Sequence, residues 1–126
     1  MLEAILLSLS TAEANHGIPE GLLKAICTVE SNLNPEAVNK HDGAVGKHSF
    51  GLCQVQLQTA QQRCGTKSGK DLLNTDKNID CAARYLAYQY KRYGNWDGAV
   101  IAYNKGSWSG GKSNVYLRKV QSVRSN

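Results

Sequence analysis

Residues 25–35, AICTVESNLNP, place a single carboxylate, Glu30, inside a run that has the spacing of a buried helix. At about 100° per residue, the apolar side chains between Leu22 and Leu33 fill one wide arc, and Glu30 falls inside that arc. A carboxylate that faces a core is costly unless it is paired or stays neutral through a raised pKa. Two interpretations stay open on this pattern: a structural ion pair or rim position that reaches water, and a general acid that an apolar pocket keeps protonated.

The rest of the chain continues this helical pattern. Pro19 is typical of a first helical turn, and Asn34-Pro35 is typical of a helix end. Residues 51–63 begin like a strand and continue like a helix, and residues 35–50 form a loop. Helical segments are predicted over about 2–15, 19–33 and 78–93, in a short stretch that Asp97 can cap, and from about 114 onward.

The length of 126 residues allows one domain with a single modest core. The first ten residues, MLEAILLSLS, lack a basic start and carry Glu3, and their large apolar residues recur at helical spacing. We therefore expect an amphipathic first helix and, in the chain as given, no export signal. No run is long or apolar enough to span a bilayer, so stable membrane insertion is not expected.

The charge is unevenly distributed along the chain. The net charge is +5, yet residues 1–45 hold six acids against two bases, and from Lys105 onward there are five bases and no acid. A basic face of this kind favours a polyanion such as nucleic acid or an anionic cell wall, or simply aids solubility. Because no zinc-finger spacing and no RRM-type signature is present, a nucleic-acid partner is not expected.

The four cysteines show no metal-binding spacing. There is no CxxC pair and no histidine at zinc-finger spacing, so we expect no metal and no cofactor. Cys27 and Cys53 lie in apolar stretches that fit plain core residues, and whether they or any other pair form a disulfide stays open. A disulfide between Cys64 and Cys81 stays open as an alternative, if the protein works outside the cytoplasm.

Three polar segments interrupt the apolar pattern. They are Glu30-Ser31-Asn32, residues 49–54 (SFGLCQ) and residues 102–106 (AYNKG). Neutral hydrogen-bonding groups beside one carboxylic acid suit a sugar or a peptide. A phosphate is disfavoured because no phosphate-cradling glycine loop is present.

In this order the three segments resemble those of the lysozyme-like lytic transglycosylases, the soluble-lytic-transglycosylase catalytic domain family that includes phage lysins and secretion-system enzymes. Residues 30–35 match the family's E-S-x-x-N-P, residues 51–54 match G-L-M-Q with a cysteine for the methionine, and residues 102–106 match A-Y-N-x-G. The resemblance covers roughly residues 15–107. It implies a mainly α, lysozyme-like single domain over residues 1–126, with about six to seven helices and little or no sheet.

The resemblance also implies an activity. Such enzymes cleave the β-1,4 bond between N-acetylmuramic acid and N-acetylglucosamine in peptidoglycan without consuming water, and leave a 1,6-anhydromuramic end. Glu30 is then the single catalytic acid and base. Tyr103 is expected to point its hydroxyl toward the region of Glu30, and Asn104 is expected to brace the motif. The substrate-binding residues that the resemblance implies are Ser49, Gln54, Gln56, Tyr103 and Asn104.

The implied setting is a monomer that acts on peptidoglycan glycan strands in the periplasm or outside the cell, delivered by a phage or a secretion system or processed to a mature form. Three alternatives stay open. Asp42, if it reached the cleft, would activate a water and give a hydrolytic muramidase of the goose type. A non-catalytic glycan-binding or virion module is the second alternative, and DNA binding through the basic C-terminal part is the third.

Overall fold

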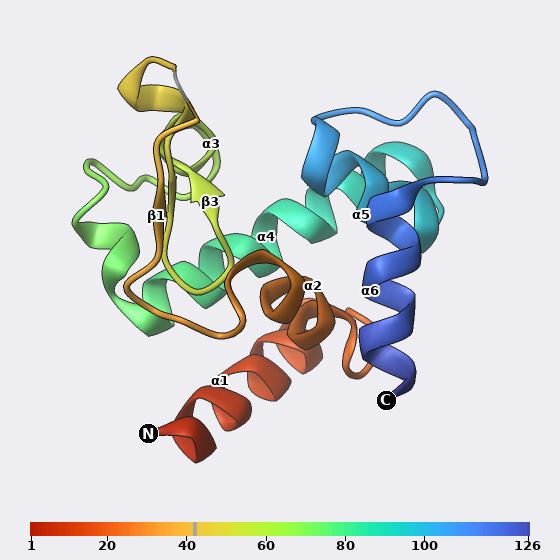
Figure 1. Cartoon of the computed structure of the whole chain (residues 1–126), viewed down its shortest axis with the longest axis horizontal. Coiled ribbons are helices and arrows are strands. Elements are labelled where there is room, and N and C mark those ends of the chain that lie inside the picture. Colours follow the sequence, from red (N-terminus) through yellow and green to blue (C-terminus); the bar gives the residue numbers. More distant parts are fainter. Residues whose placement is uncertain (42) are drawn as a thin grey trace.

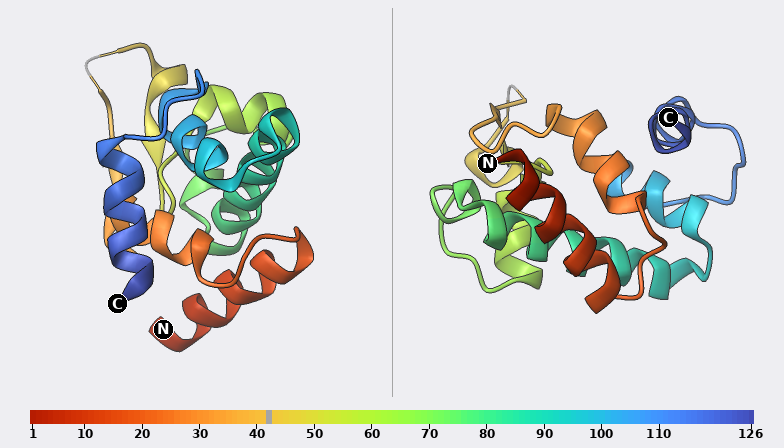
Figure 2. Two further views of the ribbon diagram at one scale, coloured as in Figure 1. Left: turned by 90° about the vertical axis from the view of Figure 1, so that its right-hand side faces the viewer. Right: turned by 90° about the horizontal axis from the view of Figure 1, so that it is seen from below.

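The computed structural model describes residues 1–41 and 43–126, and in these residues it shows six α-helices and one small sheet (Figure 1). The helices are α1 (Leu2–Asn15), α2 (Leu22–Ser31), α3 (Leu57–Arg63), α4 (Thr75–Tyr93), α5 (Trp96–Lys105) and α6 (Val115–Ser125). Helix α4 crosses the middle of the molecule, where α1, α3 and α5 pack against it, and α2 packs between α1 and α6 (Figures 1 and 2). Two short 3-10 turns, η1 (Val45–Lys47) and η2 (Asp71–Leu73), lie in the connections.

The sheet is antiparallel, with its strands in the order β1 (Val38–Asn39), β2 (Ser49–Phe50) and β3 (Val55–Gln56). It lies over the end of α4 that α3 also covers (Figure 1). Residues 51–63, which fit both a strand and a helix in sequence, form both: β3 runs directly into α3. The expectation of a mainly α chain with little sheet is confirmed.

Helix α2 begins three residues later than the sequence predicted. The predicted start at Pro19 is wrong, because Pro19 opens a tight turn in which its carbonyl accepts from the Leu22 amide at 3.1 Å. Gly21 then takes a left-handed conformation with φ of 81° and precedes the first helical residue. At the other end the helix stops at Ser31, because Asn32 and Leu33 both adopt positive φ.

A buried acid on α1 caps the start of α2. The Glu13 side chain is only 4% exposed, and its carboxylate accepts from the backbone N–H groups of Gly21 at 2.9 Å and Lys24 at 3.1 Å. These amides have no partner within their own helix, and a negative charge is favourable at a helix N-terminus. Glu13 therefore positions the helix that carries Glu30.

Replacing Glu13 with Ala should lower the free energy of unfolding by about 2 kcal/mol, because both helix-terminal amides lose a charged acceptor. Urea denaturation followed by circular dichroism measures this loss. The matched control is Glu3→Ala, which removes an exposed acid from the first turn of α1, the helix that also carries Glu13. This substitution should lower the free energy of unfolding by less than about 1 kcal/mol. Equal losses in the two variants would contradict the capping role.

Three further helix starts are capped by asparagine side chains. Asn74 accepts from Lys77, Asn95 from Gly98 and Asn114 from Leu117, each from the backbone amide. The prediction that Asp97 caps a short helix is wrong, because Asn95 takes this place and Asp97 lies inside the first turn of α5. The long helix also begins earlier than the predicted residue 78.

Because α4 starts at Thr75, Asn78 lies within its first turns, and its side chain is completely buried in the protein. Its side-chain amide donates to the carbonyls of Phe50 at 2.7 Å and Leu72 at 2.8 Å, and its oxygen accepts from the Cys53 amide at 2.8 Å. Gly51, with φ of 79°, passes so close to Asn78 and the Leu72 carbonyl that a Cβ at this position would overlap both. Asn78 thus fixes the turn over residues 50–53.

The four cysteines form two disulfides. The Cys64–Cys81 bridge, which the sequence left open, ties the end of α3 to α4. Cys27 and Cys53, whose disulfide state the sequence also left open, form a second bridge and are not plain core thiols. The apolar setting that the sequence indicated is confirmed, because both residues are fully buried. Burial alone does not distinguish a free cysteine from a disulfide-bonded one. This second bridge joins α2 to the turn that precedes Gln54.

Candidate active site

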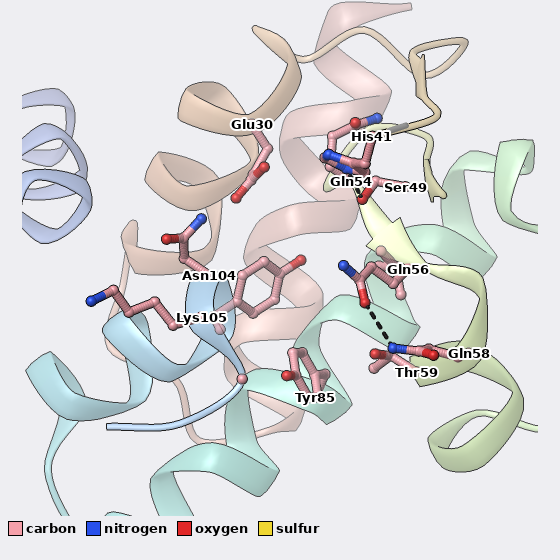
Figure 3. A pocket seen from close by; sticks show the side chains of 13 residues that line it. Glu30, His41, Ser49, Gln54, Gln56, Gln58, Thr59, Tyr85, Asn104 and Lys105 are labelled. Carbon is pink, nitrogen blue, oxygen red and sulfur yellow. Dashed lines mark hydrogen bonds between the residues drawn. The ribbon is translucent and has the colours of Figure 1, made fainter. Parts of the chain in front are cut away.

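The structure brings all six predicted site residues to one cavity of about 270 Å³ between α2, the sheet and α5 (Figure 3). Glu30 enters from α2, Ser49, Gln54 and Gln56 come from the sheet and its turn, and Tyr103 and Asn104 come from α5. Other lining residues are His41, Val55, Gln58, Thr59, Tyr85, Lys105 and Gly106. Most of these side chains are neutral hydrogen-bonding groups.

Glu30 lies in the last turn of α2, half-buried at the edge of the cavity. Burial raises the pKa of its carboxyl group, and the hydrogen bond that Tyr116 donates lowers it in part, so that the net shift is upward. The salt bridges among the described residues do not include Glu30, which disfavours the ion-pair interpretation. The position is therefore that of an acid whose protonated form is favoured at higher pH than usual.

Tyr116 is the functional neighbour that sequence reasoning missed. Its hydroxyl donates to Glu30 Oε2 at 2.6 Å from α6, across 86 positions in the chain. Burial raises the pKa of Tyr116 far above its usual value, and the nearby Glu30 raises it further, so the phenol remains the donor. In the sequence Tyr116 precedes the apolar Val120 by four residues, which places both on one face of a helix. A buried phenol needs a partner for its hydroxyl, and this was the available signal.

The hydrogen-bond partner of the Tyr103 hydroxyl is a backbone carbonyl. Instead of meeting Glu30, the hydroxyl donates to the backbone carbonyl of Cys53 at 2.7 Å. Its ring borders the cavity. Burial is the main cause that raises the pKa of Tyr103, and the nearby Glu30 raises this pKa further. Tyr103 therefore holds the turn before Gln54 and supplies a wall of the cavity.

Asn104 also differs from its expected role. It was predicted to brace its own motif, yet its side chain is exposed and makes no hydrogen bond to another described residue. It lines the cavity, and in Figure 3 it lies between Glu30 and Lys105. Its amide is therefore available to a ligand.

The opposite wall is built from Ser49, Gln54 and Gln56. The Ser49 hydroxyl is hydrogen-bonded to the His41 ring, with 2.9 Å between Oγ and Nε2. The Gln54 amide nitrogen donates to the carbonyls of Ala37 and Gly51, which leaves its oxygen as a free acceptor among the described contacts. Gln56 accepts from Gln58 at 3.2 Å (Figure 3).

Glu30 is the sole carboxylate among the described residues that line this cavity. Asp42, the acid that a hydrolytic mechanism would use, lies outside the described residues. No group of three or more potential metal ligands occurs in residues 1–41 and 43–126. Over the same ranges, no helix has the length and apolar character that a membrane span requires.

Comparison with known proteins identifies relatives for this chain. The family model for the transglycosylase SLT domain matches residues 8–121. The membrane-bound lytic murein transglycosylase C of Edwardsiella ictaluri (strain 93-146) is 35% identical over 89 residues, which is 65% of this chain. The match spans only 23% of that longer protein.

Solved structures share the fold. The 70-kDa soluble lytic transglycosylase in complex with bulgecin A superimposes with a TM-score of 0.66 at 25% identity, over 94% of this chain and 18% of that one. Wild-type DslA superimposes with a TM-score of 0.68 at 22% identity, over 97% of this chain and 88% of that one. The expected lysozyme-like lytic transglycosylase fold is confirmed. With nearly its whole length matched by the family model, the chain belongs to the transglycosylase SLT domain family.

Proposed function

We propose that this chain is a peptidoglycan lytic transglycosylase that cleaves the bond between N-acetylmuramic acid and N-acetylglucosamine without water. One observation carries the proposal: Glu30 lies at the cavity as a partly buried acid with a raised pKa, held by Tyr116. An acid that stays protonated can donate to a glycosidic oxygen. The described cavity offers no second carboxylate of the kind that two-carboxylate glycosidases use.

In the proposed reaction Glu30 gives its proton to the glycosidic oxygen as the C1–O bond of the muramic acid breaks. The N-acetyl group of the same sugar stabilises C1 while the N-acetylglucosamine leaves as an alcohol. Ionised Glu30 then takes the proton of the 6-hydroxyl as O6 closes on C1. The acid returns to its starting state, and the product carries a 1,6-anhydro ring. Tyr116 would stabilise the transient carboxylate by its hydrogen bond.

The remaining cavity residues would bind the glycan. Ser49, Gln54, Gln56 and Asn104 present hydroxyl and amide groups, which match the N-acetyl and hydroxyl groups of amino sugars. Tyr103 would act through its ring and through the turn that its hydroxyl holds. This set requires no cofactor and no metal.

We further propose that the chain works as a monomer of one domain, over residues 1–126, at the cell wall in the periplasm or outside the cell. Two disulfides in a small domain support an oxidising compartment. Attraction of the basic C-terminal part to anionic wall polymers would assist binding. Neither nucleic acid nor membrane insertion is part of this proposal.

The function is tested by digesting purified peptidoglycan and assaying the new glycan ends. We expect soluble fragments to appear without a matching rise in reducing ends, because the anomeric carbon of a 1,6-anhydro sugar is blocked and such an end is non-reducing. A stoichiometric rise in reducing ends would instead identify a hydrolase. Binding to the walls without any soluble product would identify a non-catalytic module.

Replacing Tyr116 with Phe should move the alkaline limb of the pH–activity profile to higher pH. In the wild type the hydrogen bond from Tyr116 lowers the pKa of Glu30 and so offsets part of the effect of burial. Without this bond, burial raises the pKa of Glu30 further. Because the acid is active when protonated, the loss of activity shifts upward in pH. We also expect kcat to fall roughly tenfold, since the ionised carboxylate loses a charge-assisted bond.

The pH dependence of kcat on peptidoglycan measures both effects of this substitution. Tyr90→Phe is the matched control, because Tyr90 is exposed on α4 and stacks on Trp96 away from the cavity. An unchanged alkaline limb in Tyr116→Phe would show that this hydroxyl does not tune Glu30.

A further inference from the structure

A second hollow meets Glu30 on the side away from the sheet. It has a volume of about 540 Å³, lies between α2, α5 and α6, and includes Lys105 and Lys119. It continues along α6 into a further hollow that shares Val29, Val115 and Lys119 and ends at Arg118. Helix α6 packs beside α2 here (Figure 2). We call this continuous depression the α6 groove.

The α6 groove differs chemically from the cavity. The cavity is lined mainly by neutral amides and hydroxyls and shares Lys105 with the groove. The groove adds the cations Lys119 and Arg118 and the apolar side chains of Val29 and Val115. None of these cations takes part in a salt bridge among the described residues. In Figure 3 the Lys105 side chain extends away from the other cavity side chains, toward the side on which α6 lies.

The only acid that lines the groove among the described residues is Glu30 itself. Burial favours the neutral form of this acid, so it offers little charge to the lysines. Three unpaired cations beside an apolar strip match a ligand that has carboxylates on a short aliphatic backbone. A neutral glycan lacks such groups.

The proposed substrate carries such a ligand at the required place. The peptide stem of peptidoglycan is attached through a lactyl ether to O3 of the same muramic acid whose C1 reacts at Glu30. A stem must therefore leave the cavity next to Glu30, where the α6 groove opens. Peptide stems end in free carboxylates and contain aliphatic side chains.

We infer that the α6 groove binds the anionic peptide stem of the reacting muramic acid. Lys105 and Lys119 pair with stem carboxylates near the sugar, Arg118 receives a carboxylate farther along, and Val29 and Val115 contact the aliphatic part of the stem. The inference rests on the proposed function, because it places the reacting sugar at Glu30. It makes Lys105 and Lys119 determinants of substrate specificity.

The test compares two soluble substrates: glycan strands that keep their peptide stems and the same strands stripped of stems by an amidase. We expect wild type to show a higher kcat/KM on stem-bearing strands. In the double variant K105Q/K119Q the ratio of the two kcat/KM values should fall about five- to tenfold, since two charge pairs are lost. Raising the salt concentration should lower the wild-type ratio in the same direction.

Lys91→Gln is the matched control, because Lys91 is an exposed lysine on α4 that lines neither the cavity nor the α6 groove. Its ratio should equal that of wild type. A third substrate, with the stem carboxylates converted to amides, should behave like stripped strands with the wild-type enzyme. This arm separates charge recognition from contact with the rest of the stem.

Three results would overturn the inference. An unchanged ratio in K105Q/K119Q would show that the lysines do not sense the stem. An equal loss on both substrates would show that the groove holds the glycan itself. Weaker attachment to whole walls with an unchanged ratio would assign the lysines to another wall polymer. Failure of wild type to turn over either substrate would instead refute the proposed function, and the inference would fall with it.

Discussion

Replacing Glu30 with Gln should lower kcat on peptidoglycan by about a thousandfold or more, the largest effect expected from any single substitution in this chain. Gln keeps the size of the side chain and can still accept from the Tyr116 hydroxyl, but it has no proton to donate to the leaving oxygen. It also cannot take the proton of the 6-hydroxyl afterwards. Because one group carries both steps in the proposed reaction, no other described residue of the cavity can replace it.

The same substitution should leave the fold intact and make it slightly more stable at neutral pH. Burial raises the pKa of Glu30 in the folded state above the ordinary value that it has in the unfolded chain. The folded protein then binds more protons than the unfolded chain between those two pKa values, so its stability falls as pH rises through this window. Glu30→Gln removes this pH-dependent loss of stability. Thermal unfolding of wild type and variant at pH 4 and pH 7 measures the difference.

The matched control for activity is Glu36→Gln, because Glu36 is exposed in the loop after α2 and lines neither the cavity nor the α6 groove. It should keep wild-type turnover. A Glu30→Gln variant that clears cell walls as fast as wild type would show that Glu30 is not the acid. Loss of activity together with loss of folding would leave the stability prediction wrong.

Replacing Asn78 with Ala should lower the free energy of unfolding by about 3–5 kcal/mol. The substitution leaves the Cys53 amide and the carbonyls of Phe50 and Leu72 without their partner in the interior. It also opens a small cavity at a site with no exposed surface. The turn over residues 50–53 would loosen, and with it the position of Gln54, so activity should fall as well.

Chemical denaturation of the disulfide-bonded protein measures this loss. Asn15→Ala is the matched control, since Asn15 is an exposed residue at the end of α1. It should change the free energy of unfolding by less than about 0.5 kcal/mol. A similar small change for Asn78→Ala would show that water satisfies the three backbone groups and that the buried amide is not needed.

The helical content of this protein could be predicted because it depends on local patterns. The apolar spacing in residues 2–15 predicted α1 with the correct bounds. The start of α2 was missed because Gly21 and the distant Glu13 set it, and a contact across eleven positions leaves no periodic signal. The Cys27–Cys53 bridge could not be predicted for the same reason: it depends on how two buried segments meet.

The residues of the site could be predicted, but their hydrogen-bond partners could not. The three motifs contain four of the six predicted site residues, and Ser49 and Gln56 lie within two residues of the second motif. The fold brings all six to one cavity. The partner of Glu30 is Tyr116 rather than Tyr103, because α6 folds back beside α2 and the Tyr103 hydroxyl is occupied by the Cys53 carbonyl. Only tertiary packing decides which phenol reaches the acid. The α6 groove likewise exists only where two helices meet.

The central claim is that Glu30 works alone and that O6 of the substrate, not water, attacks C1. The most direct measurement is mass spectrometry of the glycan ends formed by the wild-type enzyme in water enriched in oxygen-18. The account predicts 1,6-anhydromuramic ends that contain no label. Labelled oxygen at C1 of the new ends would show that water attacks, and would contradict the account.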